Sequence, residues 1–140
     1  MNDAYTLALF DVVKETSITH GYDLPEPIEA YVVMLLASYV DKTDFLPETF
    51  AESFLTIKTT TEAKELGDTC LFVAGVFPTM GTRKGLSRRY YQDIGATSYE
   101  MASDMNTELF PILARHFNFL SNFIGVTVSS SKHEMSSLFR

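Results

Sequence analysis

The segment "TTTEAKELGDTCLFVAGVFP", residues 59–78, decides the fold class of this chain. Threonine is a favoured residue at a helix start, and Pro78 marks where the helix has to end. The apolar positions between them recur at steps of four, three and four: Leu66, Cys70, Val73 and Phe77. This spacing is typical of an amphipathic helix, which we predict over residues 59–77. Gly67 and Gly75 inside it predict close contact with a neighbouring helix.

The same helical period recurs along the rest of the chain, whereas strict apolar–polar alternation is nearly absent. We therefore predict an all-α fold, a compact single-domain bundle of about six helices over residues 1–140. The other expected helices cover residues 4–16, 27–41, a short stretch ending near 58, 88–105 and 107–124. For residues 125–140 three alternatives stay open: a frayed end, an extension of the last helix, or a short edge strand.

Size and cysteine content favour one domain that needs no covalent staple. The chain has 140 residues, of which 46% are hydrophobic, and this is enough to bury a core without metal or disulfides. The single cysteine, Cys70, lies in an apolar run, so a small buried side chain is the favoured interpretation and a nucleophile the alternative.

Charge is distributed unevenly along the chain. The net charge is −7, with thirteen acids and four lysines in residues 1–68 but five acids and seven bases in residues 69–140. An acidic surface repels phosphate backbones, and no tract combines dense basic residues with spaced aromatics. We therefore expect no binding of nucleic acid.

The N-terminal segment and the apolar runs bear on location. "MNDAYTLALFDVV", residues 1–13, has two acids and no basic residue, which is the wrong charge for a secretory signal. The longest apolar run, residues 30–40, is well short of the roughly 20 residues that span a membrane. A soluble, cytoplasmic protein without membrane contact is the expectation.

Basic residues cluster before and within the fifth expected helix. Ser87 is a favoured N-cap, which places Arg88 and Arg89 in the first turn, where the helix dipole disfavours cations. A negative counterpart is therefore expected nearby. It is either the carboxylates of Asp93 and of the acidic first half, or an anionic phosphate or carboxylate ligand. The candidate ligand-binding residues are Arg83, Lys84, Ser87, Arg88, Arg89, Tyr90 and Tyr91.

Known cofactor motifs do not match. Gly81 and Gly85 enclose three residues, and Leu86 stands where a phosphate-binding loop needs lysine. The three histidines show no metal-ligand spacing with one another or with Cys70. We predict neither a metal nor a cofactor.

A second feature of the fifth helix is its tyrosines. Tyr91, Gly95 and Tyr99 repeat every four residues, so two rings flank a bare backbone patch on one helix face. This face is predicted to pack against a helix of the same chain or of a partner in a dimer, or to hold an aromatic ligand. Leu86, Tyr90, Ile94, Thr97, Met101 and Met105 are expected along the apolar face of the same helix.

Residues 66–103 and the stretch "AYVVMLLASYV", residues 30–40, resemble a family of uncharacterised small helical bacterial proteins. Its pattern is LGDxxLFxxGxFP followed by YYxxxGxxxY. The resemblance implies a shared core, and it implies no activity. That core contains Gly75, Tyr90, Tyr91, Gly95 and Tyr99.

Two functions stay open on the sequence. The first is a non-enzymatic binding, regulatory or protein-interaction module, a homodimer or the partner of another protein, working through residues 77–87 and the Tyr91–Gly95–Tyr99 face. The second is a sensor or enzyme for a small anionic metabolite, which the Arg83–Arg89 loop would bind.

Overall fold

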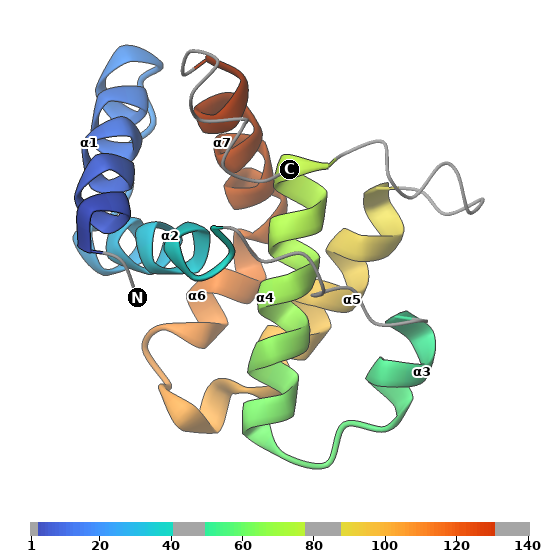
Figure 1. Cartoon of the computed structure of the whole chain (residues 1–140). Coiled ribbons are helices and arrows are strands. Elements are labelled where there is room, and N and C mark those ends of the chain that lie inside the picture. Colours follow the sequence, from blue (N-terminus) through green and yellow to red (C-terminus); the bar gives the residue numbers. More distant parts are fainter. Residues whose placement is uncertain (1–2, 41–49, 78–87, 131–140) are drawn as a thin grey trace. The chain divides into compact units, whose positions relative to one another are not determined.

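The computed structural model describes residues 3–40, 50–77 and 88–130 (Figure 1). These residues form seven α-helices and one short 3₁₀-helix, η2, and no strand. The all-α prediction is confirmed. The chain divides into two compact units, unit 1 with residues 1–44 and 123–140 and unit 2 with residues 45–122. A single domain over residues 1–140 stays a prediction.

Unit 2 is organised around a helix pair. Its elements are α3 (Phe50–Leu55), α4 (Thr60–Val76), α5 (Arg88–Met101), η2 (Ser103–Met105), α6 (Phe110–Arg115) and the beginning of α7 (Phe117–Ser130). The long helix α4 packs along α5, while α3 contacts both and α6 contacts α5 (Figure 1). The core of the unit therefore lies along the α4–α5 contact.

The start of α4 follows from its sequence. Thr59 is the N-cap, and its hydroxyl oxygen accepts a bond from the Glu62 backbone N–H at 3.1 Å. The Glu62 carboxylate in turn accepts from the Thr59 N–H at 3.2 Å, which completes a capping box. The predicted start and apolar face of α4 are confirmed, since Leu66, Cys70 and Val73 are buried.

The last expected helix is broken in two. We predict one helix over residues 107–124, but α6 ends at Arg115, because its C-cap His116 has a ψ of 22°, outside the helical region, and α7 begins at Phe117. Pro111 lies at the start of α6, as its missing N–H requires. At its other end α7 continues to Ser130, so residues 125–130 extend the helix, and residues 131–140 lie outside the described residues.

Unit 1 contains α1 (Asp3–Thr19), α2 (Glu26–Ser38) and the end of α7. Gly21, with a φ of 70°, turns the chain after α1, and the Ser17 hydroxyl donates to the Tyr22 carbonyl at 2.6 Å. The Tyr22 ring meets the Phe123 ring edge to face, with centroids 5.0 Å apart. This contact fixes the turn against α7.

Helices α1 and α2 pack on each other within unit 1. The packing face of α1 contains Leu9 and Val13, both buried. Lys14 donates to the buried Glu29 carboxylate of α2 at 3.3 Å. In the described ranges, no helix is both long and apolar enough to cross a membrane.

Candidate functional site

The residues predicted to bind an anion are only partly described. Arg83, Lys84 and Ser87 lie outside the described residues, as does the rest of the loop 78–87. Arg88, Arg89, Tyr90 and Tyr91 form the first turn of α5. The side chains of these four residues have different surroundings. Within the group, the rings of Tyr90 and Tyr91 meet edge to face, with centroids 5.6 Å apart.

Arg88 meets its negative counterpart within the chain. Its Nε donates to the backbone carbonyl of Ala74 at 2.9 Å. Ala74 lies in the last turn of α4, where carbonyls have no partner inside the helix and the dipole is negative. A backbone carbonyl is a third source of negative charge, besides the carboxylates and the anionic ligand that the sequence predicts. Because Pro78 ends the helix, the sequence does indicate that the last carbonyls of α4 need partners from outside it.

Arg89 points to solvent. Its side chain is 86% exposed, and its Nε lies 4.0 Å from the Asp93 carboxylate, which is 73% exposed. The pair predicted from the sequence is present. Because both groups are so exposed, it contributes little to stability. Arg88 therefore links the start of α5 to the end of α4, whereas Arg89 lies in solvent.

Tyr91, Gly95 and Tyr99 lie in the interior of unit 2. Tyr91 and Tyr99 are buried, and a Cβ added to Gly95 would lie 2.2 Å from the Phe117 ring and 2.8 Å from Cys70 Cβ. Of the alternatives predicted for this face, packing within the chain is the one that the structure shows for these three residues.

The apolar face expected for α5 is wrong. Thr97 and Met101 are exposed, whereas the buried face contains Tyr91, Gly95, Ser98 and Tyr99. Helix α5 rotates this way because Gly95 lets Phe117 and Cys70 approach its backbone, and because the tyrosine hydroxyl of residue 99 finds a partner inside. Leu86 lies outside the described residues.

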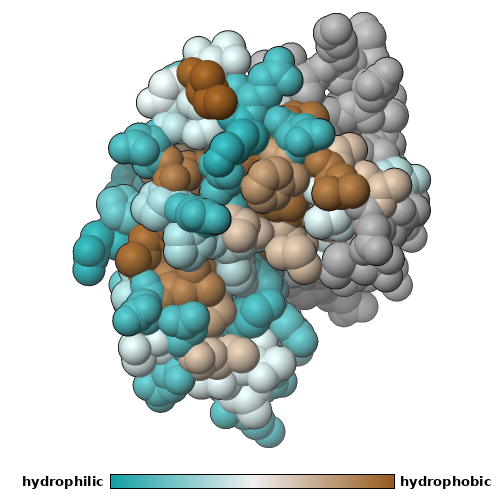
Figure 2. All heavy atoms as spheres, turned by 90° about the vertical axis from the view of Figure 1, so that its left-hand side faces the viewer, coloured by the Kyte–Doolittle hydropathy of each residue, from teal (hydrophilic) through white to brown (hydrophobic). Residues whose placement is uncertain are grey.

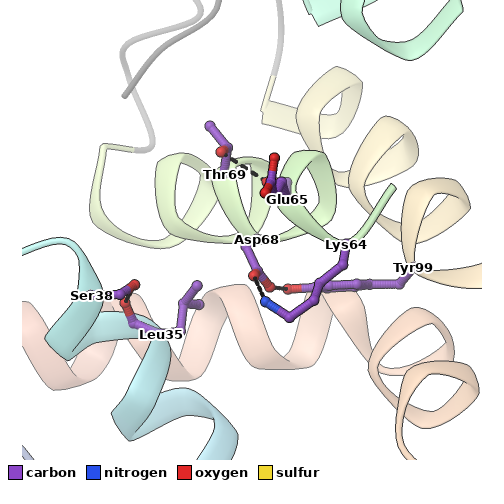
Figure 3. A network of polar contacts seen from close by, with 7 residues as sticks. All are labelled: Leu35, Ser38, Lys64, Glu65, Asp68, Thr69 and Tyr99. Carbon is purple, nitrogen blue, oxygen red and sulfur yellow. Dashed lines mark hydrogen bonds and ion pairs between the residues drawn. The ribbon is translucent and has the colours of Figure 1, made fainter. Parts of the chain in front are cut away.

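A polar network crosses the α4–α5 contact (Figure 3). The Tyr99 hydroxyl donates to Asp68 Oδ1 at 2.7 Å, and Lys64 Nζ donates to Asp68 Oδ2 at 2.8 Å. Tyr99 is fully buried and the Asp68 side chain is 13% exposed, so the carboxylate depends on these donors. This network was not predicted from the sequence. The spacing of Lys64 and Asp68, four residues apart in a largely apolar helix, is the pattern that could have indicated it.

Close packing accompanies the network. A Cβ added to Gly67 would lie 2.6 Å from the Tyr99 ring, which confirms the close contact predicted at this glycine. Nearby, Gln92 of α5 donates to the Ser121 hydroxyl at 2.9 Å. These contacts tie α5 to α4 and to α7, while the hydroxyl of Ser98, on the buried face of α5, has no hydrogen-bond partner among the described residues.

The two ionisable groups beside Gly95 are poor nucleophiles. Burial raises the pKa of the Cys70 thiol, so it stays protonated near neutral pH. Burial, with smaller contributions from Cys70 and Tyr90, also raises the pKa of Tyr91. The interpretation of Cys70 as a small buried side chain is confirmed. In the described part of the chain, no group of three metal-binding side chains comes together.

The outer face of α1 has large exposed apolar side chains, which the sequence pattern did not predict. Leu7, Phe10 and Ile18 are 68%, 42% and 75% exposed. Leu7 and Ile18 lie opposite the buried Leu9 and Val13, and Phe10 lies beside them. Figure 2 shows this side of the molecule, where brown apolar side chains emerge among teal polar ones. Exposed apolar side chains of this size can be covered by contact with another surface, which would remove them from water.

Comparisons of the chain with models of known families, with curated proteins and with solved structures find no match. The function is therefore argued from the described surfaces alone.

Proposed function

We propose that the protein is a non-enzymatic binding module of the bacterial cytoplasm, which works by associating with another protein chain through the outer face of α1. The observation that carries this proposal is the exposure of Leu7 and Ile18, at 68% and 75%, on one face of a helix whose other face is buried. Covering both side chains would remove two large apolar groups from water, which favours association.

The use of polar groups in unit 2 supports a role without catalysis. Both oxygens of Asp68 accept bonds from side chains of the same unit, and Arg88 is bound to the end of α4. The raised pKa of Cys70 keeps its thiol in the unreactive form. These groups support the α4–α5 scaffold, and a scaffold that displays a separate apolar helix face suits a binding module.

The proposal also adopts the resemblance to uncharacterised small helical bacterial proteins, and with it the bacterial cytoplasm as the location. Of the working surface predicted on the sequence, Tyr91, Gly95 and Tyr99 pack inside unit 2, while residues 78–87 lie outside the described residues and stay a prediction. The outer face of α1 replaces the Tyr91–Gly95–Tyr99 face as the surface proposed for a partner.

Site-specific photocrosslinking in bacterial cells tests the proposal. A photoreactive amino acid replaces Leu7 or Ile18, and in the control it replaces Ala8, which is exposed but projects about 100° away from Leu7 around α1. We expect a discrete crosslinked protein from positions 7 and 18 and none from position 8. Equal products at all three positions, or no product, would contradict the proposal.

A further inference from the structure

The end of α4 has a carbonyl that the next residues of the backbone cannot cap in the common way. The last helical residue is Val76 and the C-cap is Phe77, so Ala74 is the third residue from the end. At many helix ends, the N–H of the residue after the C-cap donates to the carbonyl of this third residue. Here the residue after the C-cap is Pro78, and proline has no N–H. The Ala74 carbonyl therefore needs a donor other than residue 78.

Arg88 supplies such a donor from the first turn of α5. Its Nε donates to the Ala74 carbonyl at 2.9 Å. The donor bears a full positive charge, and the acceptor lies at the negative end of the α4 dipole, so the charge strengthens the bond. The last turn of α4 has no basic side chain of its own. Arg88 thus brings both the hydrogen bond and the positive charge that this helix end lacks.

The antiparallel register of α4 and α5 explains why a long side chain is used. Cys70 of α4 lies beside Gly95 of α5, where an added Cβ would be 2.8 Å from the Cys70 Cβ. At 1.5 Å per residue, Ala74 lies about 6 Å further along α4, and Arg88 lies about 10 Å back along α5. An arginine side chain is long enough to cross the difference of about 4 Å along the helix axes.

We propose that Arg88 is the C-terminal cap of α4 and replaces the N–H that Pro78 lacks. The two residues act as a pair, because the proline removes a backbone donor and the arginine provides one from the next helix. The cap ties the start of α5 to the end of α4. It also offsets the cost of a cation in the first turn of α5, which the dipole of that helix disfavours. This inference concerns unit 2 and is independent of the partner proposed for α1.

Arg89 is the matched comparison, because it lies in the same turn of α5 and bears the same charge. Its side chain is 86% exposed, and its Nε lies 4.0 Å from the exposed Asp93 carboxylate. Replacing either arginine removes one cation from the start of α5, but only the substitution of Arg88 removes a bond to α4. The difference between the two substitutions therefore measures the cap.

A double-mutant cycle tests the pairing of Arg88 with Pro78. Urea denaturation gives the equilibrium constant for folding of the wild type, Arg88→Met, Pro78→Ala and the double variant. Methionine keeps most of the length of the side chain but has no donor. We expect Arg88→Met to lower the constant about fivefold in the wild type. In the Pro78→Ala background, where the alanine N–H can donate to the Ala74 carbonyl, the loss should be less than about twofold.

Two results would overturn the proposal. The first is an equal loss from Arg88→Met with proline and with alanine at position 78, which would show that the arginine does not replace the missing N–H. The second is a loss from Arg88→Met no larger than that from Arg89→Met, which we expect to stay below about twofold. Neither result bears on α1, so the proposed function would be unaffected.

Amide hydrogen exchange locates the effect within α4. The Phe77 N–H donates to the Val73 carbonyl in the last turn, and the Glu62 N–H donates to the Thr59 hydroxyl in the first. Without the cap, exchange at Phe77 should become at least about threefold faster in Arg88→Met, and exchange at Glu62 should stay the same. Equal acceleration at both ends, or none at Phe77, would overturn the cap, because the substitution would then have no local effect on the end of α4.

Discussion

Helices α1 and α4 have the same length, 17 residues each, but opposite relations to water. Every residue of α4 from Leu66 to Gly75 is buried, whereas of residues 4–19 in α1 only Leu9, Val13 and Thr16 are. Small residues make the difference, because Gly67 lets the Tyr99 ring approach the backbone of α4. Helix α4 is therefore part of the core of unit 2, whereas α1 has apolar residues that unit 1 does not bury.

The two helices also treat charge differently. In α4 the carboxylate of Asp68 points inward and is bound by Tyr99 and Lys64. In α1 Asp11 lies at the surface, where water solvates it. Substitutions in the α4–α5 contact should therefore lower the free energy of unfolding, whereas substitutions on the outer face of α1 should leave it nearly unchanged.

The largest effect is expected from Gly95→Ala. The new Cβ would lie 2.2 Å from Phe117 and 2.8 Å from Cys70, so the helices have to move apart. We expect a loss of about 3 kcal/mol in the free energy of unfolding, measured by urea denaturation. Alanine has a higher helix propensity than glycine, which is worth about 1 kcal/mol in a helix interior, but the steric overlap should cost more than this gain.

Gly21→Ala is the control for this prediction. A Cβ at Gly21 meets nothing within 4 Å, but its φ of 70° is unfavourable for alanine. The loss should be about 1 kcal/mol, from backbone strain alone. If Gly95→Ala is no more destabilising than Gly21→Ala, the close α4–α5 contact is wrong.

An intermediate effect is expected from Tyr99→Phe. Removing the hydroxyl leaves Asp68 Oδ1 without the donor that lies 2.7 Å away, while the ring still fills its place. A hydrogen bond to a charged, buried group is worth about 2 kcal/mol. Lys64→Met is the comparison: its side chain is 35% exposed, and the loss should stay below about 1 kcal/mol. Thermal unfolding that ranks the two variants in the reverse order would contradict the network.

The smallest effect is expected at the start of α5. Arg88→Ala removes the bond to the Ala74 carbonyl and should cost about 1 kcal/mol, whereas Arg89→Ala, at an exposed residue, should cost almost nothing. Thermal unfolding measures both.

The same measurement in a panel of phosphates and carboxylates tests the anion-binding alternative. A melting temperature that rises with one anion, and a rise that both Arg83→Ala and Arg88→Ala abolish, would support it. The same response in all variants would count against an anion site at these arginines.

Sequence predicts the helices well where local signals agree. The threonines at its start, Pro78 at its end and the periodic apolar residues placed α4 correctly, and the Arg89–Asp93 pair follows from one helical turn. The face of α5 could not be predicted in this way, because the apolar count favours Tyr90, Ile94 and Met101. What orients the helix is the absence of a side chain at Gly95.

Long-range contacts account for the other differences. The partner of Arg88 is a backbone carbonyl 14 residues earlier, and backbone groups leave no trace in the side-chain pattern. The break at His116 interrupts a run in which apolar residues continue on both sides, so periodicity alone joins α6 to α7. The exposed residues of α1 were overlooked because a helix needs only one apolar stripe to pack.

The burial of Cys70 gives the chain a built-in reporter. This single thiol lies under α5, close enough to Gly95 that a thiol reagent reaches it only after the two helices separate. The rate of its labelling in native buffer therefore measures how often unit 2 opens. Unit 1 has no cysteine and does not contribute to this signal, so one chemical probe reads the dynamics of one half of the molecule without engineering.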